Sequence, residues 1–276
     1  MVTVISLTPA KPSRSFWYEH PSVMLPQTPS FRLDGRRALV TGAGRGIGLA
    51  LAAALAEAGA AVTLAARTAS EIEAGAQAIR DGGGCAEAAV LDVSDLGAVA
   101  EFFAARPAFH VLVNNAGTNR PKPMQEVSKA DYDAVLDLNL KSAFFVAQGC
   151  ARQMIADEVR GSMIHIGSQM GHVGGPNRSL YCASKWALEG MSKSFALDLA
   201  GHGIRSNTIA PTFITTAMTA PFLEDEGFKA SVLSKIKLGR FGTPEDLMGA
   251  AVFLAADASA LMTGTSVVVD GGWTAE

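Results

Sequence analysis

The sequence has few cysteines, little net charge and no apolar run long enough to span a membrane. Its three cysteines are odd in number and lack the paired spacing of a disulfide framework or a zinc site: Cys85, Cys150 and Cys182. They indicate reduced thiols in a cytoplasmic protein. The net charge of −3 gives no electrostatic reason to expect nucleic acid or an anionic membrane as a partner. The composition, 49% hydrophobic and 18% charged over 276 residues, is that of one large α/β domain.

Residues 1–32 differ from the rest of the chain in composition. Five of the twelve prolines fall there, at Pro9, Pro12, Pro21, Pro26 and Pro29. Proline at this density prevents a helix or a central strand, and the aromatic residues 16–18 favour an extended arm that packs on its own or a neighbouring subunit. A disordered tail is the alternative. The segment lacks the apolar core of a signal peptide, and we expect residues 33–276 to form the single folded domain.

A tyrosine and a lysine stand four residues apart in the second half of the chain, at the head of a helical pattern. The spacing places Tyr181 and Lys185 on one helix face, about one turn apart. A phenol has a pKa of about 10, and a nearby ammonium group favours its ionised form. The pair is therefore a candidate proton-transfer device, although such spacing also occurs by chance on amphipathic helices. Upstream, Ser168 follows a predicted strand at 163–167.

A glycine-rich turn lies between a predicted strand at 37–41 and a predicted helix at 47–58. Its residues are Gly42, Gly44, Arg45, Gly46, Ile47 and Gly48. Residues without side chains let the backbone approach a ligand closely, and the helix end presents unpaired N–H groups. Strand, glycine turn and helix in this order predict a pyrophosphate site.

The next predicted strand, at 61–65, indicates which dinucleotide is bound. An acidic residue at such a strand end binds the ribose hydroxyls of NAD, whereas a cation accommodates the 2′-phosphate of NADP. Ala66 stands where the acid would be, Arg67 and Thr68 follow it, and Arg45 adds a second positive charge. The pattern predicts NADP, with NAD possible if the two arginines are only solvated surface charges.

Four motifs together resemble the short-chain dehydrogenase/reductase family. They are the Tyr181/Lys185 pair with Ser168 upstream, the spacing Thr41-Gly-x-x-x-Gly-x-Gly48, the run Asn114-Asn115-Ala116-Gly117 after a predicted strand at 110–113, and Asn139 inside a helical pattern at 129–155. The resemblance covers about residues 33–276. It implies an α/β Rossmann fold with a seven-stranded parallel sheet and helices on both faces, consistent with the alternating strand and helix patterns.

The resemblance also assigns roles to residues. Tyr181 would donate a proton to a carbonyl oxygen, Ser168 would orient that oxygen, Lys185 would bind the nicotinamide ribose and lower the tyrosine pKa, and Asn139 would kink its helix and hold a water of the proton relay. No metal is implied. Tyr181 and Lys185 would contact the cofactor as well, together with Asp92, Val93, Asn114, Ala116, Gly117, Pro211, Ile214 and Thr216. Asp92 and Val93 follow a predicted strand at 88–91. Asp92 could instead cap the next helix, but Asp95 serves that cap better, which leaves Asp92 for the cofactor. Thr212 departs from the glycine that the family usually has after the proline.

The function implied is hydride transfer between NADP(H) and a carbonyl or secondary alcohol. Two rivals remain: a 3-oxoacyl thioester reductase acting on an acyl carrier protein, and a dinucleotide-binding regulator without catalysis. Residues 212–238 are predicted to form a substrate lid, whose acidic run 224–226 argues against an acyl carrier. The family implies a homo-oligomer, most often a tetramer, and excess apolar residues on two helices favour it: Phe144, Phe145, Trp186 and Phe195.

The substrate itself is indicated only by short similarities. Asn119-Arg120 and the run 224–228 resemble the branch of the family that acts on sugar acids such as gluconate. We expect Arg120 either to project over the cleft and bind a substrate carboxylate, or to form a surface salt bridge to the acidic lid.

Overall fold

The computed structural model describes residues 25–217 and 219–275. Most of the predicted arm, residues 1–24, lies outside the described residues. Seven strands form one parallel sheet in the order β3-β2-β1-β4-β5-β6-β7. They are β1 Arg37–Thr41, β2 Ala61–Ala66, β3 Cys85–Val90, β4 Val111–Asn114, β5 Ser162–Ile166, β6 Arg205–Pro211 and β7 Ser266–Val269. The predicted fold class is confirmed, and the strand order reverses between β1 and β4, where such sheets bind their ligands.

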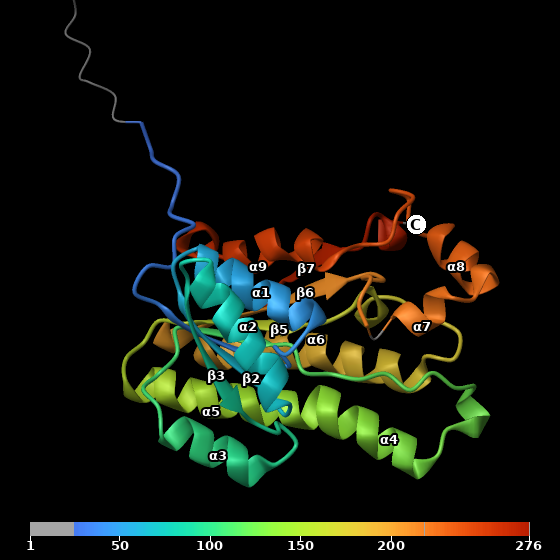
Figure 1. Ribbon diagram of the computed structural model, residues 1–276, viewed down its shortest axis with the longest axis horizontal. Helices are drawn as coiled ribbons and strands as arrows, with labels where there is room; N and C mark the ends of the chain where they lie inside the picture. Colours follow the sequence, from blue (N-terminus) through green and yellow to red (C-terminus); the bar gives the residue numbers. More distant parts are fainter. Residues whose placement is uncertain (1–24, 218, 276) are drawn as a thin grey trace, which may run out of the picture.

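Helices cover both faces of the sheet (Figure 1). One layer contains α1 (Gly46–Glu57), α2 (Ala69–Asp81) and α9 (Met248–Ala255). The other contains α3 (Leu96–Ala104), α5 (Ser142–Ala156) and α6 (Ser179–Leu199), with α4 (Lys129–Leu136) packed beside α6. Two short helices, α7 (Ala220–Leu223) and α8 (Glu226–Leu233), stand apart at the right of Figure 1. Among the described residues, no helix is both long and apolar enough to cross a bilayer.

Side chains of the central strands alternate between the two layers. In β1, Ala38 and Val40 pack against α1 and α9, while Leu39 packs against the opposite layer. Ile164 and Met163 of β5 divide in the same way. A parallel sheet covered on both faces needs apolar side chains on both, which explains why its strands read as continuous apolar runs.

The third strand begins earlier than the sequence indicated. We expected it at 88–91, but it runs from Cys85 to Val90 and pairs along its whole length with β2. Glu87 interrupts the apolar pattern of the sequence, so that pattern did not predict the first half of the strand. That carboxylate accepts a hydrogen bond from Thr63 on the neighbouring strand at 2.8 Å. Pairing with β2 therefore overrides the local composition.

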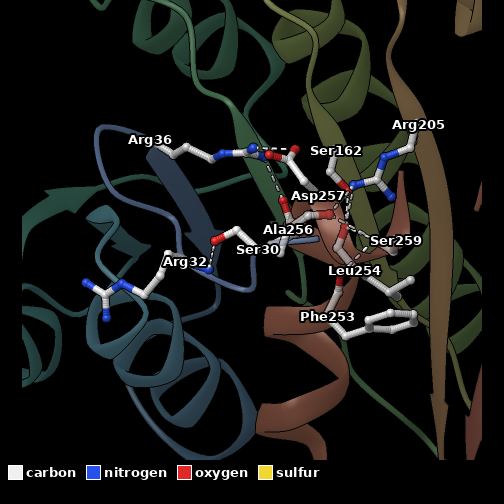
Figure 2. A network of polar contacts seen from close by, with 11 residues as sticks. Ser30, Arg32, Arg36, Ser162, Arg205, Phe253, Leu254, Ala256, Asp257 and Ser259 are labelled. Carbon is white, nitrogen blue, oxygen red and sulfur yellow. Dashed lines mark hydrogen bonds and ion pairs between the residues drawn. The ribbon is translucent and has the colours of Figure 1, made fainter. Parts of the chain in front are cut away.

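A polar network braces the end of the sheet that lies opposite the carboxyl ends of its strands (Figure 2). Arg36, just before β1, donates to the Ala255 carbonyl at 3.0 Å and to the Asp257 carboxylate at 2.6 Å. Arg205, at the start of β6, donates to the Leu254 carbonyl at 2.8 Å. The last carbonyls of a helix have no partner within it, so these guanidinium groups satisfy the end of α9 and fasten it to the sheet.

Candidate active site

A cleft of about 440 Å³ opens at the carboxyl ends of the strands. Most of the residues predicted to bind the cofactor or to react line it: Gly42, Gly44, Arg45, Gly46, Ile47, Gly48, Arg67, Thr68, Asp92, Val93, Ala116, Gly117, Ser168, Tyr181, Lys185, Pro211, Ile214 and Thr216. We call the side around the turn 42–48 the glycine-loop end, and the side around Tyr181 the tyrosine end.

The glycine loop is shaped for close approach of a ligand. Gly42 has φ of +64°, a conformation that side chains rarely adopt, and a Cβ at Gly48 would collide with the Gly42 carbonyl oxygen. The Asn115 amide donates to that same carbonyl at 3.1 Å and fixes the turn. The helix N-cap is Arg45, whose side chain has no oxygen to accept the first N–H groups of α1. This backbone cradle fits a dinucleotide pyrophosphate.

Two arginines and an acid meet beside the strand end at Ala66. Arg45 donates to Glu71, on the first turn of α2, at 2.9 Å. Arg67 also lines the cleft here, and Ala66 offers no carboxylate. A net positive group at this position fits a ribose 2′-phosphate. Glu71 was not predicted, because the sequence gives no sign that α2 turns this acid toward the glycine loop.

Asp92 and Asp95 divide their tasks at the end of β3. Asp95 caps α3 by accepting from the Gly97 and Ala98 N–H groups, both at 3.0 Å, which confirms the predicted cap. Asp92 lines the cleft and accepts from the Ser94 hydroxyl at 2.6 Å. The hydrogen bonds from Ser94, with the charge of Arg67 beside it, lower the pKa of Asp92. The carboxylate is therefore held ionised at the glycine-loop end.

At the tyrosine end, α6 presents a phenol and an ammonium group. The Lys185 Nζ donates to the Ile166 carbonyl at 2.7 Å and lies 5.6 Å from the centroid of the Tyr181 ring. Burial lowers the pKa of Lys185 to about 8, so the group is still mainly charged at neutral pH. Burial raises the pKa of Tyr181, while its hydrogen bond with Ser168 and the charge of Arg178 lower it. The phenol is thus protonated at neutral pH and able to act as an acid.

Ser168 follows β5 at the cleft and is the N-cap of a short 3-10 helix, Gln169–Gly171. Its hydroxyl oxygen accepts from the Met170 N–H at 3.1 Å, and its proton is donated to the Gln169 side chain at 2.8 Å. A hydroxyl has one proton to give. A substrate oxygen that binds Ser168 must therefore take this donor from Gln169.

Two predicted site residues do not line the cleft. Asn139 is buried in a π-helical segment, Asp137–Lys141, that interrupts the predicted long helix between α4 and α5. Its side chain binds both backbone groups of Thr118, at 2.7 and 2.9 Å, and donates to Ser184 at 3.0 Å. It holds the loop after Gly117 against the helix that carries Lys185.

Asn114 is the second of these residues. It lies at the end of β4, and its amide donates to the Ala143 carbonyl of α5 at 2.7 Å. The side chain is buried, and Asn115 faces the cleft in its place. The first asparagine therefore ties a strand to a helix, and the second fixes the glycine loop.

The tyrosine end also contains residues that sequence reasoning missed. They come from loops that have no recognisable motif: Thr118, Asn119, Gln169, Met170, Arg178 and Phe213. Arg178 offered one signal, since it stands one helical turn before Tyr181. Phe213 follows the predicted Pro211 closely but was considered only as part of the lid.

The predictions for Arg120 were wrong. Its guanidinium lies outside the cleft lining and pairs with Asp131 of α4 at 3.3 Å, with 48% of the side chain exposed. Lys122 binds the same carboxylate at 2.6 Å. Asp131 attracts both cations because it is buried at the start of α4, where it forms a capping box with Ser128. The acidic residues 224–226 of the predicted lid are exposed, and the ion pair of Arg120 is with Asp131 and not with them.

Comparison with known proteins agrees with this geometry. The model of a family described as Enoyl-(Acyl carrier protein) reductase, adh_short_C2, matches residues 42–274. Gluconate 5-dehydrogenase of Gluconobacter oxydans is 40% identical, over 88% of this chain and 96% of its own. D-erythrulose reductase of Gallus gallus is 38% identical, over 89% and 98%. A crystal structure of a gluconate 5-dehydrogenase from Burkholderia cenocepacia, in complex with NADP and tartrate, has a TM-score of 0.85 and 40% identity over 89% and 98%.

The fold and the cleft define a dinucleotide-binding oxidoreductase. The chain belongs to the short-chain dehydrogenase/reductase family, as the motifs predicted.

Proposed function

We propose that the protein transfers a hydride between NADP(H) and the carbonyl or alcohol carbon of a sugar or sugar acid. One observation carries the proposal: a single cleft joins a pyrophosphate cradle with two arginines to a serine, a tyrosine and a lysine placed for proton transfer. The relatives named above act on gluconate and erythrulose, and one was crystallised with NADP, which supports both the cofactor and the substrate class.

When bound, NADP(H) supplies or accepts the hydride. The chain supplies the proton. In the reductive direction, Tyr181 donates its phenolic proton to the substrate oxygen while Ser168 donates a hydrogen bond to the same oxygen. The charge of Lys185 stabilises the phenolate that forms, because the ammonium group lies beside the ring in a buried setting. In the oxidative direction, the same phenolate accepts the proton from the alcohol.

Asn139 acts in this mechanism as a positioning residue. Both N–H donors of its amide and one acceptor site of the amide oxygen hold Thr118 and Ser184, so it keeps the loop after Gly117 in register with the catalytic helix. The family's role for this residue, support of the water chain that returns a proton to the lysine, remains part of the proposal.

The lid is also part of the proposal. Thr212, Phe213, Ile214 and Thr216 reach the cleft from the segment at 212–238, and α7 and α8 extend from it beyond the sheet (Figure 1). Phe213 packs edge to face on Phe228 of α8, with ring centroids 5.7 Å apart. A movement of α8 would therefore be transmitted to the tyrosine end, which is what a substrate lid requires.

A homotetramer in the cytoplasm completes the proposal. Phe144, Phe145 and Trp186 leave more than a third of their surfaces exposed, on neighbouring helices α5 and α6. Phe144 and Phe145 line a shallow groove together with Leu140 and Phe195. Exposed aromatic residues gathered on one face favour an interface with another copy. Light scattering that gave the mass of a monomer would contradict this assembly.

The test of the function is a panel of ketoses, keto acids, sugar alcohols and a 3-oxoacyl thioester, each assayed with NADPH or NADP and with NADH or NAD. We expect turnover of sugars or sugar acids, with NADP(H) preferred. The thioester is included because the matching family model is described as an acyl-carrier-protein reductase. The exposed acidic run 224–226 would repel an acidic carrier, so we expect the thioester to be the poorer substrate. A strong preference for the thioester would overturn the proposed substrate class.

A further inference from the structure

A buried carboxylate lies on the catalytic helix, one turn beyond the lysine. Glu189 follows Lys185 by four residues in α6, so the helical spacing places both side chains on one face. Glu189 is only 6% exposed, and it does not line the cleft. The mechanism above gives it no task. Burying a carboxylate costs free energy unless hydrogen bonds and charges compensate for it, so the position calls for a reason.

The packing around Glu189 holds its carboxylate in one place. Thr208 on β6 donates to its Oε2 atom at 2.7 Å. A Cβ at Gly167 would lie 2.6 Å from its Oε1 atom, so the glycine leaves the room that this oxygen occupies. Gly167 directly follows Ile166, whose carbonyl accepts from the Lys185 Nζ at 2.7 Å. The carboxylate therefore packs against the same strand end that anchors the ammonium group.

The groups that face Glu189 favour its ionised form. The Nε2 atom of His172, in the connection after β5, lies 3.7 Å from its Oε1 atom and 3.0 Å from the Ser266 hydroxyl of β7. Lys193 stands one turn further along α6. Burial raises the pKa of Glu189, whereas the hydrogen bond from Thr208, the charges of His172 and Lys193, and a hydrogen bond with Ser266 lower it. These partners oppose the cost of burial and keep a negative charge inside the protein.

That charge acts on the catalytic lysine. Burial lowers the pKa of Lys185 to about 8, and the charge of Glu189 opposes this fall. The other groups near the lysine are neutral at neutral pH. Burial and the charge of Lys185 lower the pKa of His165, on β5, to about 4, Tyr181 is protonated, and the π-helical segment contributes the amide of Asn139. A lysine that titrates this close to neutrality is sensitive to the loss of one nearby charge.

We propose that Glu189 is a positioning residue for catalysis, whose buried carboxylate keeps Lys185 in its charged form beside Tyr181. The inference rests on the proposed function, because it acts through the lysine charge that stabilises the phenolate. Without the carboxylate, the lysine would lose its proton at a lower pH, and the enzyme would lose activity first on the alkaline side. A glutamate that served only packing would affect all pH values alike.

The first test measures the charge of Lys185 without any turnover. Competitive labelling of the full-length enzyme with acetic anhydride, followed lysine by lysine by mass spectrometry, gives the pH at which Lys185 loses its proton. The reagent can reach the ammonium group because Lys185 lines the cleft. We expect the midpoint in Glu189→Gln to lie roughly one pH unit below that of the wild type. Glu189→Asp keeps the charge and should restore most of the shift.

The second test measures kcat/KM from pH 6 to 9 for the best carbonyl substrate of the panel with NADPH. A midpoint that falls from about 8 to about 7 lowers the charged fraction at pH 8 roughly fivefold and changes it little at pH 6. We expect Glu189→Gln to show the same pattern and Glu189→Asp to recover part of the loss at pH 8. The control Glu101→Gln removes an exposed carboxylate of α3 and should resemble the wild type throughout.

The outcomes separate this inference from the proposed function. NADPH binding, followed by fluorescence titration, shows that a variant is folded, and Glu189→Met replaces Glu189→Gln if the amide is not tolerated. An unchanged labelling midpoint, or a loss of activity that is equal at pH 6 and pH 8, would overturn the role of Glu189 and leave the proposed function standing. A wild type that reduces no substrate of the panel would overturn the proposed function and the catalytic role together. The labelling midpoint would still decide whether Glu189 sets the charge of Lys185.

Discussion

The two ends of the cleft are built differently. The glycine-loop end consists mainly of backbone and small residues at the ends of adjacent strands, with Gly48 packed too closely for a side chain and Gly42 in a conformation that side chains rarely adopt. The tyrosine end consists of larger side chains, such as Gln169 and Arg178 from the connection after β5 and Phe213 from the loop after β6. Backbone suits a ligand that every member of a family shares, whereas side chains on loops suit a ligand that varies.

The two ends also differ in how they handle charge. At the glycine-loop end, each carboxylate that lines the cleft lies near an arginine. Glu71 pairs with Arg45, and the charge of Arg67 helps to lower the pKa of Asp92. At the tyrosine end, Arg178 and Lys185 are buried cations, and burial lowers the pKa of both. Substitutions at one end should therefore change cofactor selection, and those at the other should change chemistry or substrate selection.

The largest expected effect separates the ends most clearly. Tyr181→Phe removes the transferable proton and keeps the ring, so we expect turnover to fall roughly 10²- to 10⁴-fold. The dissociation constant of NADPH, measured by fluorescence titration, should stay near that of the wild type because the glycine-loop end is untouched. A variant with near-normal kcat would refute the assignment of Tyr181 as the acid.

The second effect concerns the pH dependence of stability at the tyrosine end. Lys185 has a pKa of about 8 in the folded chain, against 10.5 for an ordinary lysine. Between these values the unfolded chain holds the proton that the folded chain has lost, so this group's contribution to folding stability rises with pH. The rise amounts to about 3 kcal/mol over the window.

Urea unfolding of Lys185→Met measures this contribution. The free energy of unfolding of the methionine variant, minus that of the wild type, should be largest at pH 7 and below. This difference should fall as the pH rises from 8 to 10.5, because the wild type gains stability over that range. Lys193→Met is the control, since Lys193 is exposed on the same helix. A difference that is independent of pH would mean that burial does not depress the lysine pKa.

The glycine-loop end was the more predictable of the two from sequence. Its parts are contiguous: a strand, a turn that needs glycine and a helix start, and the spacing of the glycines reports the geometry directly. The tyrosine end depends on loops that tertiary contacts place, as Asn139 places Thr118. Arg120 was misassigned for that reason, because its partner Asp131 becomes buried only when α4 packs. The helical pattern of the sequence likewise did not predict the π-helical segment that interrupts the long helix.

A third prediction sharpens the comparison at the glycine-loop end. Arg67→Ala removes a cation beside Ala66, so we expect kcat/KM for NADPH to fall roughly 10- to 100-fold, in line with loss of a charge-assisted hydrogen bond. The value for NADH should change little, because NADH has no 2′-phosphate. Steady-state kinetics with both cofactors decide it. An equal fall in kcat/KM for NADPH and for NADH would show that Arg67 does not bind the 2′-phosphate.

The smallest expected effect concerns Glu71, which pairs with Arg45 at the same end. The ion pair is partly exposed, with 72% of the arginine side chain and 35% of the glutamate side chain accessible, so its strength is at most about 1 kcal/mol. A 2′-phosphate arriving beside Ala66 would meet Arg67 at once but would have to draw Arg45 away from Glu71. The glutamate also adds a negative charge that repels the phosphate.

We therefore expect Glu71→Gln to lower KM for NADPH by up to about fivefold and to leave KM for NADH unchanged. Glu73→Gln is the matched control, since Glu73 lies on the same helix and pairs with Arg80 at 2.7 Å, and neither lines the cleft. A rise in KM for NADPH would show the opposite role, in which Glu71 orients Arg45 toward the phosphate. In either case the change should vanish for NADH, because a pair that acts through the 2′-phosphate has no target there.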